Sequence, residues 1–319
     1  MLWLTWRQHR WPLITVAAIL TVYWTFLVYA GLTGRQALAG CPSWQVAPDW
    51  CFDASRSVHG IYTRMNEAAW YGRLLPLVIG VFWGAPLLAR ELEQGTHRLA
   101  FTQSVTRRRW LAVKIGVLAG VAALFGAVTG ALVAWARGQY AQMYATRPFG
   151  DQEFFASSGA VIPAAMWVAA LLAGVMIGLL LRRTVAAMAV TLILLPLAAG
   201  GLGLIRPHYL PPVERLADGA QMFFDPGAPN QEQGWVLAIS YLDPAGRELD
   251  REAAGAICAD PSNTYPTAEC LDRTGLRQRA LYHPADRYPW FQLIEAGLLL
   301  AASAAMALTV WWRVVHRRG

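Results

Sequence analysis

Residues 154–205 read FFASSGAVIPAAMWVAALLAGVMIGLLLRRTVAAMAVTLILLPLAAGGLGLI, and this stretch decides the fold class. It consists of two runs without charged residues, 154–181 and 184–205, separated only by Arg182 and Arg183. A helix needs about 20 apolar residues to cross the roughly 30 Å hydrocarbon core of a membrane. Both runs reach that length, so the stretch predicts two membrane-spanning helices joined by a short basic turn.

Four further charge-free runs lie outside this stretch, at 11–34, 74–89, 115–136 and 296–312. The run 74–89 is short but can include Trp70 and Tyr71, and the last run extends back to Trp290 if Glu295 is tolerated within it. The composition is 56% hydrophobic and 15% charged, whereas soluble domains carry about a quarter charged residues. We therefore predict an all-α polytopic membrane protein with six transmembrane helices.

The arginines predict which ends of these helices face the cytoplasm. With the N-terminus inside, the inner segments 1–11, 90–110, 182–184 and 313–319 hold 12 Arg and only two acids, whereas the outer segments hold 14 Arg and 17 acids. Short basic loops stay cytoplasmic, so both termini are expected inside. The net charge of +7 then reflects membrane orientation and contact with lipids, and no nucleic-acid partner is expected. Lys114 is the only lysine, a bias typical of a high-G+C bacterium, so the expected location is a bacterial plasma membrane.

Three regions follow from this topology. Residues 1–205 contain the first five helices with a cytoplasmic segment at 90–110, residues 206–289 form a small extracellular insertion between helices five and six, and residues 290–319 contain the sixth helix and a cytoplasmic tail. The insertion holds 10 of the 18 prolines and is expected to be rich in loops. Its apolar run 235–242 is compatible with a strand.

The four cysteines, Cys41, Cys51, Cys258 and Cys270, all fall in the predicted outer segments. An even number of cysteines on the oxidising side indicates disulfides. The local pairs Cys41–Cys51 and Cys258–Cys270 are favoured because each closes a short loop. The alternative, a metal site, is less favoured because no histidine lies at ligand spacing from either pair.

Small residues predict close helix packing in two of the spans. The pairs Gly116/Gly120 and Gly126/Gly130 lie in the third span, and Gly174/Gly178 lies in the fourth. Glycines at this spacing let helix backbones approach closely. The pattern leaves open whether the contact is within one subunit or between subunits.

Residues 90–114 contain the most specific sequence pattern in the chain. Gly95 can end a helix, Thr96 can cap the next one, and Thr106 can cap the third span. A short cytoplasmic helix between two membrane helices is thus expected, with a face that fits a groove on a partner. The alternative is a solvated positive-inside loop, which explains the arginines but not the acid pair Glu91 and Glu93.

Signatures of enzymes are missing from the sequence. It has no GxxxxGK[ST], HExxH, GxSxG or GxGxxG motif in the required context, and the six histidines are scattered. Glu295 is the only acid within a predicted span. Acids inside a membrane are often functional, but Glu295 lies five residues from Trp290 and can also reach the interface, so both readings stay open.

At residues 91–114 the chain resembles the permease subunits of ABC-2 type ABC transporters. Glu91, Glu93, Gly95 and Thr96 match the E-x-E-x-G-T pattern of that family, and Val105, Thr106, Arg107 and Lys114 match a second pattern, in which Ser104 replaces the usual proline. The order of six helices also agrees. The resemblance implies an ATPase-coupling set consisting of Glu91, Glu93, Gly95, Thr96, Arg107, Arg108, Arg109 and Lys114.

The resemblance further implies that the chain is half of a translocation pathway for export. It would pair with a second permease subunit, as a homodimer or heterodimer, and bind an ABC ATPase subunit through residues 90–110. ATP and Mg²⁺ would be held by that ATPase, and no cofactor or metal is expected in this chain. Two alternatives are a membrane sensor or assembly factor, whose extracellular insertion binds a cell-envelope or peptide ligand, and a membrane-embedded enzyme, which would need paired intramembrane acids or histidines.

Overall fold

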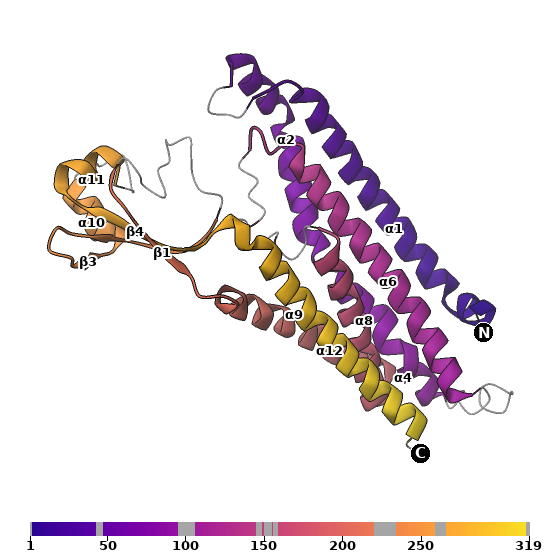
Figure 1. The fold of residues 1–319 in the computed structure, drawn as a ribbon. Helices are drawn as coiled ribbons and strands as arrows, with labels where there is room; N and C mark the ends of the chain where they lie inside the picture. Colours follow the sequence, from indigo (N-terminus) through magenta and orange to yellow (C-terminus); the bar gives the residue numbers. More distant parts are fainter. Residues whose placement is uncertain are drawn as a thin grey trace. The chain divides into compact units, whose positions relative to one another are not determined.

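The chain divides into two compact units (Figure 1). The computed structural model describes residues 2–42, 47–94, 106–144, 149, 155, 159–219, 234–258 and 266–316. The first unit comprises Met1–Thr146, Glu153–Leu204 and Gln292–Gly319, and the second comprises Arg147–Gln152 and Ile205–Phe291. Long helices make up the first unit, and the second contains a β-sheet.

Six helical segments among the described residues are long and apolar enough to cross a membrane: Leu13–Ala37, Asp49–Glu93, Arg108–Gly138, Val161–Leu181, Thr184–His208 and Ala285–His316. Their helices are α1 (Leu2–Ala37), α2 (Asp49–Gly72), α3 (Leu75–Ile79), the π-helix η2 (Gly80–Gly84), α4 (Ala85–Glu93), α6 (Arg107–Gly138), α8 (Val161–Leu181), α9 (Thr184–Ile205) and α12 (Tyr288–His316). Each predicted span overlaps one of these segments. The sixth extends back past Trp290 and includes Glu295, as expected.

The second helical segment begins much earlier than the sequence predicted. The predicted topology places residues 35–73 in an outer segment before the second span, and α2 occupies Asp49–Gly72 of this segment. Its buried residues, Cys51, Val58, Met65 and Ala69, recur at helical spacing along one face. Most exposed positions between residues 53 and 67 are polar, so an apolar stripe rather than an apolar run marks this helix.

Two prolines divide the helices that follow. Pro76 lies in the first turn of α3 and Pro86 in the first turn of α4. Proline has no N–H, and its ring crowds the carbonyl four residues earlier, so an α-helix cannot continue unchanged through it. The chain adjusts by forming the π-turn Gly80–Gly84, in which the Ala85 N–H bonds to the Gly80 carbonyl.

Helix α8 lies within the largest core cluster of the first unit. Its residues Trp167, Leu171 and Val175 join side chains from six other helices, namely Leu20, Ile79, Trp83, Leu87, Leu88, Trp110, Leu111, Leu118, Ala122 and Val310. Backbones also meet directly here. A Cβ added to Gly174 would lie 2.7 Å from the Ala85 nitrogen and closer still to the Gly80 carbonyl oxygen. The pair Gly174/Gly178 thus packs against η2 and α4 within one subunit.

The two other glycine pairs have different surroundings. Gly126 and Gly130 face the start of α8: an added Cβ on Gly126 would lie 2.6 Å from the Pro163 carbonyl oxygen, and the Gly159 N–H donates to the Gly130 carbonyl at 3.1 Å. Gly116 and Gly120 would meet no described atom within 4 Å. Two of the three pairs therefore pack against other helices of the same chain. The spacing of the glycines alone does not show which pairs do so.

A second core cluster joins α1, α2 and α6. The disulfide Cys41–Cys51 lies in it and connects the end of α1 to the start of α2, with a Cα–Cα distance of 5.8 Å. Tyr140 donates its hydroxyl to the Ala30 carbonyl at 2.7 Å. Burial raises the pKa of Tyr140 to about 12, so the hydroxyl stays protonated as a donor at neutral pH.

The second unit contains a four-stranded antiparallel sheet in the order β1-β4-β2-β3. The strands are β1 (Val213–Ala217), β2 (Trp235–Leu242), β3 (Glu248–Leu249) and β4 (Arg277–His283), and the unit also contains the short helices η3 (Arg206–His208), α10 (Arg251–Cys258), α11 (Ala268–Thr274) and η5 (Ala285–Arg287). Strand β2 covers the apolar run predicted as a strand. A register irregularity between Val236 and Ala238 interrupts its pairing with β4.

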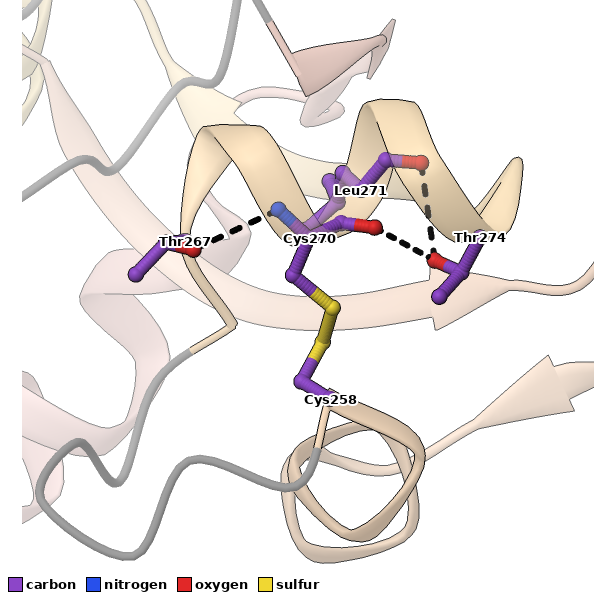
Figure 2. Close-up of a disulfide and its surroundings, with 5 residues drawn as sticks. All are labelled: Cys258, Thr267, Cys270, Leu271 and Thr274. Atoms are coloured by element: carbon purple, nitrogen blue, oxygen red, sulfur yellow. Dashed lines mark hydrogen bonds between the residues drawn. A yellow bond between two sulfur atoms is a disulfide. The ribbon is translucent and has the colours of Figure 1, made fainter.

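Helices α10 and α11 pack on the sheet and are joined by the disulfide Cys258–Cys270 (Figure 2). Thr267 caps α11 by accepting a hydrogen bond from the Cys270 N–H at 3.3 Å, and Thr274 donates its hydroxyl to the Cys270 carbonyl at 2.7 Å. The cysteines also contact Tyr241 and Leu271 in a small core. Both disulfides pair as the spacing predicted.

The insertion therefore differs from the loop-rich region expected from its prolines. Its described residues form a sheet and helices, so the all-α class applies to the first unit and not to residues 206–289. Several prolines of this region, such as Pro211, Pro212 and Pro284, lie beside strands, where a missing N–H removes no hydrogen bond from the ladder.

Candidate functional site

The candidate site consists of the helix ends on either side of residues 95–105, which lie outside the described residues. Helix α4 ends at Glu93, and α6 begins at Arg107. Thr106 caps α6, because its hydroxyl accepts a hydrogen bond from the Arg109 N–H at 3.3 Å. This confirms the cap predicted from the sequence and fixes where the third span begins.

An ion pair joins the two helix ends. The Lys114 ammonium of α6 donates to the Glu91 carboxylate of α4. The side chain of Lys114 is 4% exposed and that of Glu91 is 19% exposed, so the pair is largely removed from water. The ammonium also lies 5.2 Å from the centroid of the Trp110 ring, a favourable cation–π distance.

A second contact joins α4 to the start of α9. The Glu93 carboxylate accepts two hydrogen bonds from Thr184, from its backbone N–H at 3.0 Å and from its hydroxyl at 2.7 Å. Thr184 is the first residue of α9. The first N–H groups of a helix have no partner inside the helix, and a carboxylate is favoured at this end by the helix dipole. Glu93 thus caps α9 from a different helix.

The predicted coupling residues fall into three groups. Glu91, Glu93 and Lys114 contact residues of other helices, although the Glu93 side chain is itself exposed. Arg108 and Arg109 are exposed. Gly95 and Thr96 lie outside the described residues, as does the side chain of Arg107. Each of the two acids connects the end of α4 to another helix, Glu91 to α6 and Glu93 to α9.

The sequence did not predict two residues of the candidate site, Thr184 and Trp110. Thr184 stands directly after Arg182 and Arg183 at the start of a charge-free run, a position typical of a helix N-terminus. That signal locates the helix start but not its partner, which is 91 positions earlier in the sequence. Trp110 lies one helical turn before Lys114, so a contact between them is consistent with helical spacing.

Glu295 is fully buried on α12. A side chain reaching out to the membrane interface would be exposed, so the structure favours an interior position for this acid. Across the described ranges, no group of three or more His, Cys, Asp or Glu side chains forms a candidate metal site. The described contacts at the candidate site are a charge pair and two helix caps.

Among the described residues, six long apolar helices with a mostly apolar core define an integral membrane protein that crosses the membrane several times. The model of the family described as "ABC-2 membrane transporter related" matches residues 13–206, and the chain belongs to this family. The match includes α4, α6 and α9, and it supports an ABC-2 type permease. Permeases of this family are generally non-enzymatic, and the family implies partnership with an ABC ATPase subunit. Neither the curated proteins nor the solved structures contain a match to the chain.

Proposed function

We propose that this protein is the permease subunit of an ABC exporter, and that residues 90–110 receive the motion of a separate ATPase subunit. The observation that supports this best is the pair of contacts at the ends of that segment. Glu91 joins α4 to α6 through Lys114, and Glu93 joins α4 to α9 through Thr184. A push on the segment would therefore reach three membrane helices at once.

In this proposal a second permease subunit completes the pathway, as a homodimer or heterodimer. ATP and Mg²⁺ are held by the ATPase, and this chain needs no cofactor. The exposed Arg108 and Arg109 offer positive charge to the ATPase beside the 95–105 segment. Complementary charges at such an interface give specificity, and placing like charges opposite each other costs several kcal/mol.

The proposed orientation places both termini and residues 90–110 in the cytoplasm of a bacterial cell and the insertion 206–289 outside. The distribution of arginine supports it. The pairing of Cys258 with Cys270 in the insertion also supports it, because disulfides persist in oxidising compartments.

Labelling of intact cells tests this orientation. A membrane-impermeant maleimide should modify Glu252→Cys, an exposed position of α10, and should not modify Arg108→Cys, an exposed position of α6. After permeabilisation both should react. Labelling of Arg108→Cys in sealed cells would contradict the proposed orientation, and the reaction after permeabilisation controls for side-chain access.

Co-purification tests the partner and the docking surface. The tagged chain, extracted from its own host, should carry a stoichiometric ATPase. The double variant Arg108→Glu/Arg109→Glu should lose most of it while keeping its expression and thermal stability, because exposed charges contribute under about 1 kcal/mol each to folding. Arg277→Glu, an exposed charge reversal in the insertion, is the matched control and should retain the ATPase.

Two outcomes would contradict the proposal in different ways. Full retention of the ATPase by the double variant would remove these arginines from the interface. Absence of any ATPase, together with a ligand bound by the insertion, would favour the membrane sensor or assembly factor instead.

A further inference from the structure

Helix α9 is held to the first unit mainly by its N-terminal end. All its residues are described, and only Ala187 and Thr191 are buried. In the most apolar part of this span 6% of the residues are buried, against 50% in the most apolar part of α8, although the two spans are similar in hydropathy. The side of α9 that carries Thr184, Ala187 and Thr191 spans its first two turns. Beyond these turns only Leu195, Leu202 and Gly203 are partly covered, and the Leu195 side chain lies beside Gly80 of η2.

The attachment of these two turns is made chiefly by α4. Ala187 packs in a small cluster with Ala85 and Ala89 of α4 and with Ile177 of α8. Glu93, at the far end of α4, adds two hydrogen bonds to Thr184. Helix α9 thus contacts α4 at two points, Ala187 and Thr184. Helix α4 leads directly into the 95–105 segment.

The turn between α8 and α9 is short and has an unusual backbone. Arg182 ends α8 in the left-handed region with φ of 55°, and it is the only non-glycine residue with positive φ among the described residues. Its N–H still bonds to the Gly178 carbonyl at 3.0 Å, and the next helix begins at Thr184. The direction of the chain therefore changes within two residues, which gives α9 a pivot beside the Glu93 contact.

We infer that Glu93 is a positioning residue that fixes α9 to α4, and that α9 is the membrane helix whose position follows the 90–110 segment. When α4 moves, the two hydrogen bonds to Thr184 and the Ala187 contact carry α9 with it about the Arg182–Arg183 turn. When the Glu93 contact is lost, α9 keeps its helix and its Ala187 contact, but its orientation varies more widely. The role of this motion in transport rests on the function proposed above, whereas the fixing of α9 does not.

Spin-label distances on the permease alone, in lipid nanodiscs, test the fixing of α9. One pair of labels joins α9 to α1 through Leu197→Cys and Ile19→Cys, and a control pair joins α6 to α1 through Leu124→Cys and Ile19→Cys. All three positions are exposed, and the native cysteines are held in disulfides. Glu93→Ala should broaden the α9–α1 distance distribution and leave the α6–α1 distribution unchanged.

Hydrogen exchange gives a second readout that separates capping from general loosening. With Glu93→Ala, amides in residues 184–188 should exchange roughly fivefold faster, the size expected for loss of a helix cap, while those of α8 should not change. Thr184→Ser keeps the hydroxyl and should behave like the native protein. Thr184→Val keeps only the N–H donor and should give an intermediate rate.

The inference fails if Glu93→Ala leaves both the α9–α1 distances and the exchange of 184–188 unchanged. It also fails if α6 and α8 loosen to the same extent as α9, because Glu93 would then support the whole unit rather than position α9. A failure of the proposed function would give a different result. The permease would purify without an ATPase, while Glu93→Ala would still broaden the α9–α1 distance distribution. If both hold, Glu93→Ala should retain the ATPase and lose ATP-dependent transport.

Discussion

Glu91→Ala should destabilise the first unit by about 3 kcal/mol or more, because it leaves the buried ammonium of Lys114 without its carboxylate. Removing one partner of a buried ion pair typically costs 3–5 kcal/mol. The Lys114 side chain is 4% exposed, so water cannot readily replace the lost partner. The loss should appear as a lower midpoint of unfolding in mixed-micelle titrations followed by tryptophan fluorescence.

Two further variants separate this effect from simple truncation. Arg90→Ala removes an exposed charge next to Glu91 and should change stability by no more than about 0.5 kcal/mol. The double variant Glu91→Leu/Lys114→Met replaces both charges by apolar groups, which is often neutral for a buried pair. It should recover most of the stability, and equal loss in the single and double variants would contradict the argument.

The Glu91–Lys114 ion pair decides which variants can test the roles of Glu91 and Glu93. Reversing Glu91 and Glu93 together would break the contact with Lys114 and the cap of α9, so lost transport would not show lost docking. The paired Glu91→Leu/Lys114→Met variant keeps the helices joined and removes the charge. Docking itself is better tested at Arg108 and Arg109, whose side chains are exposed.

The features that sequence predicted well are those fixed by local chemistry. A charge-free run of membrane length specifies a span because hydrocarbon excludes charge, and all six candidate spans were located this way. The pairing of Cys258 with Cys270 followed from the short loop it closes. Strand β2 followed from an apolar run between turn residues.

The features that the sequence did not predict depend on contacts between distant segments. Helix α2 has only one apolar face, so its average hydropathy resembles that of a loop. Glu93 and Thr184 are separated by 91 positions, and β4 joins β1 and β2 although both precede it by many residues. Nothing local in these residues specifies the partner, because each choice depends on how the helices and strands pack.

The second large effect is expected at the glycine pairs, where replacing glycine by alanine should change the stability of the protein in different directions at two positions. Gly116→Ala should be neutral or should stabilise the protein by up to about 1 kcal/mol, because alanine has the higher helix propensity and the added methyl meets no described atom within 4 Å. Gly174→Ala should instead destabilise it by about 2 kcal/mol, a typical cost of overpacking a core.

The reason for the difference lies in what the methyl group meets. At Gly174 the nearest atoms are the Gly80 carbonyl oxygen and the Ala85 nitrogen. Both belong to the backbone, so a change of side-chain rotamer cannot relieve the clash, and η2 and α4 must move away from α8. Because α4 carries Glu91 and Glu93, this shift should also weaken their contacts with Lys114 and Thr184. Unfolding measurements on both variants, with hydrogen exchange at residues 184–188, would show the two effects together. Equal stability of Gly116→Ala and Gly174→Ala would contradict the close packing of α8 on α4.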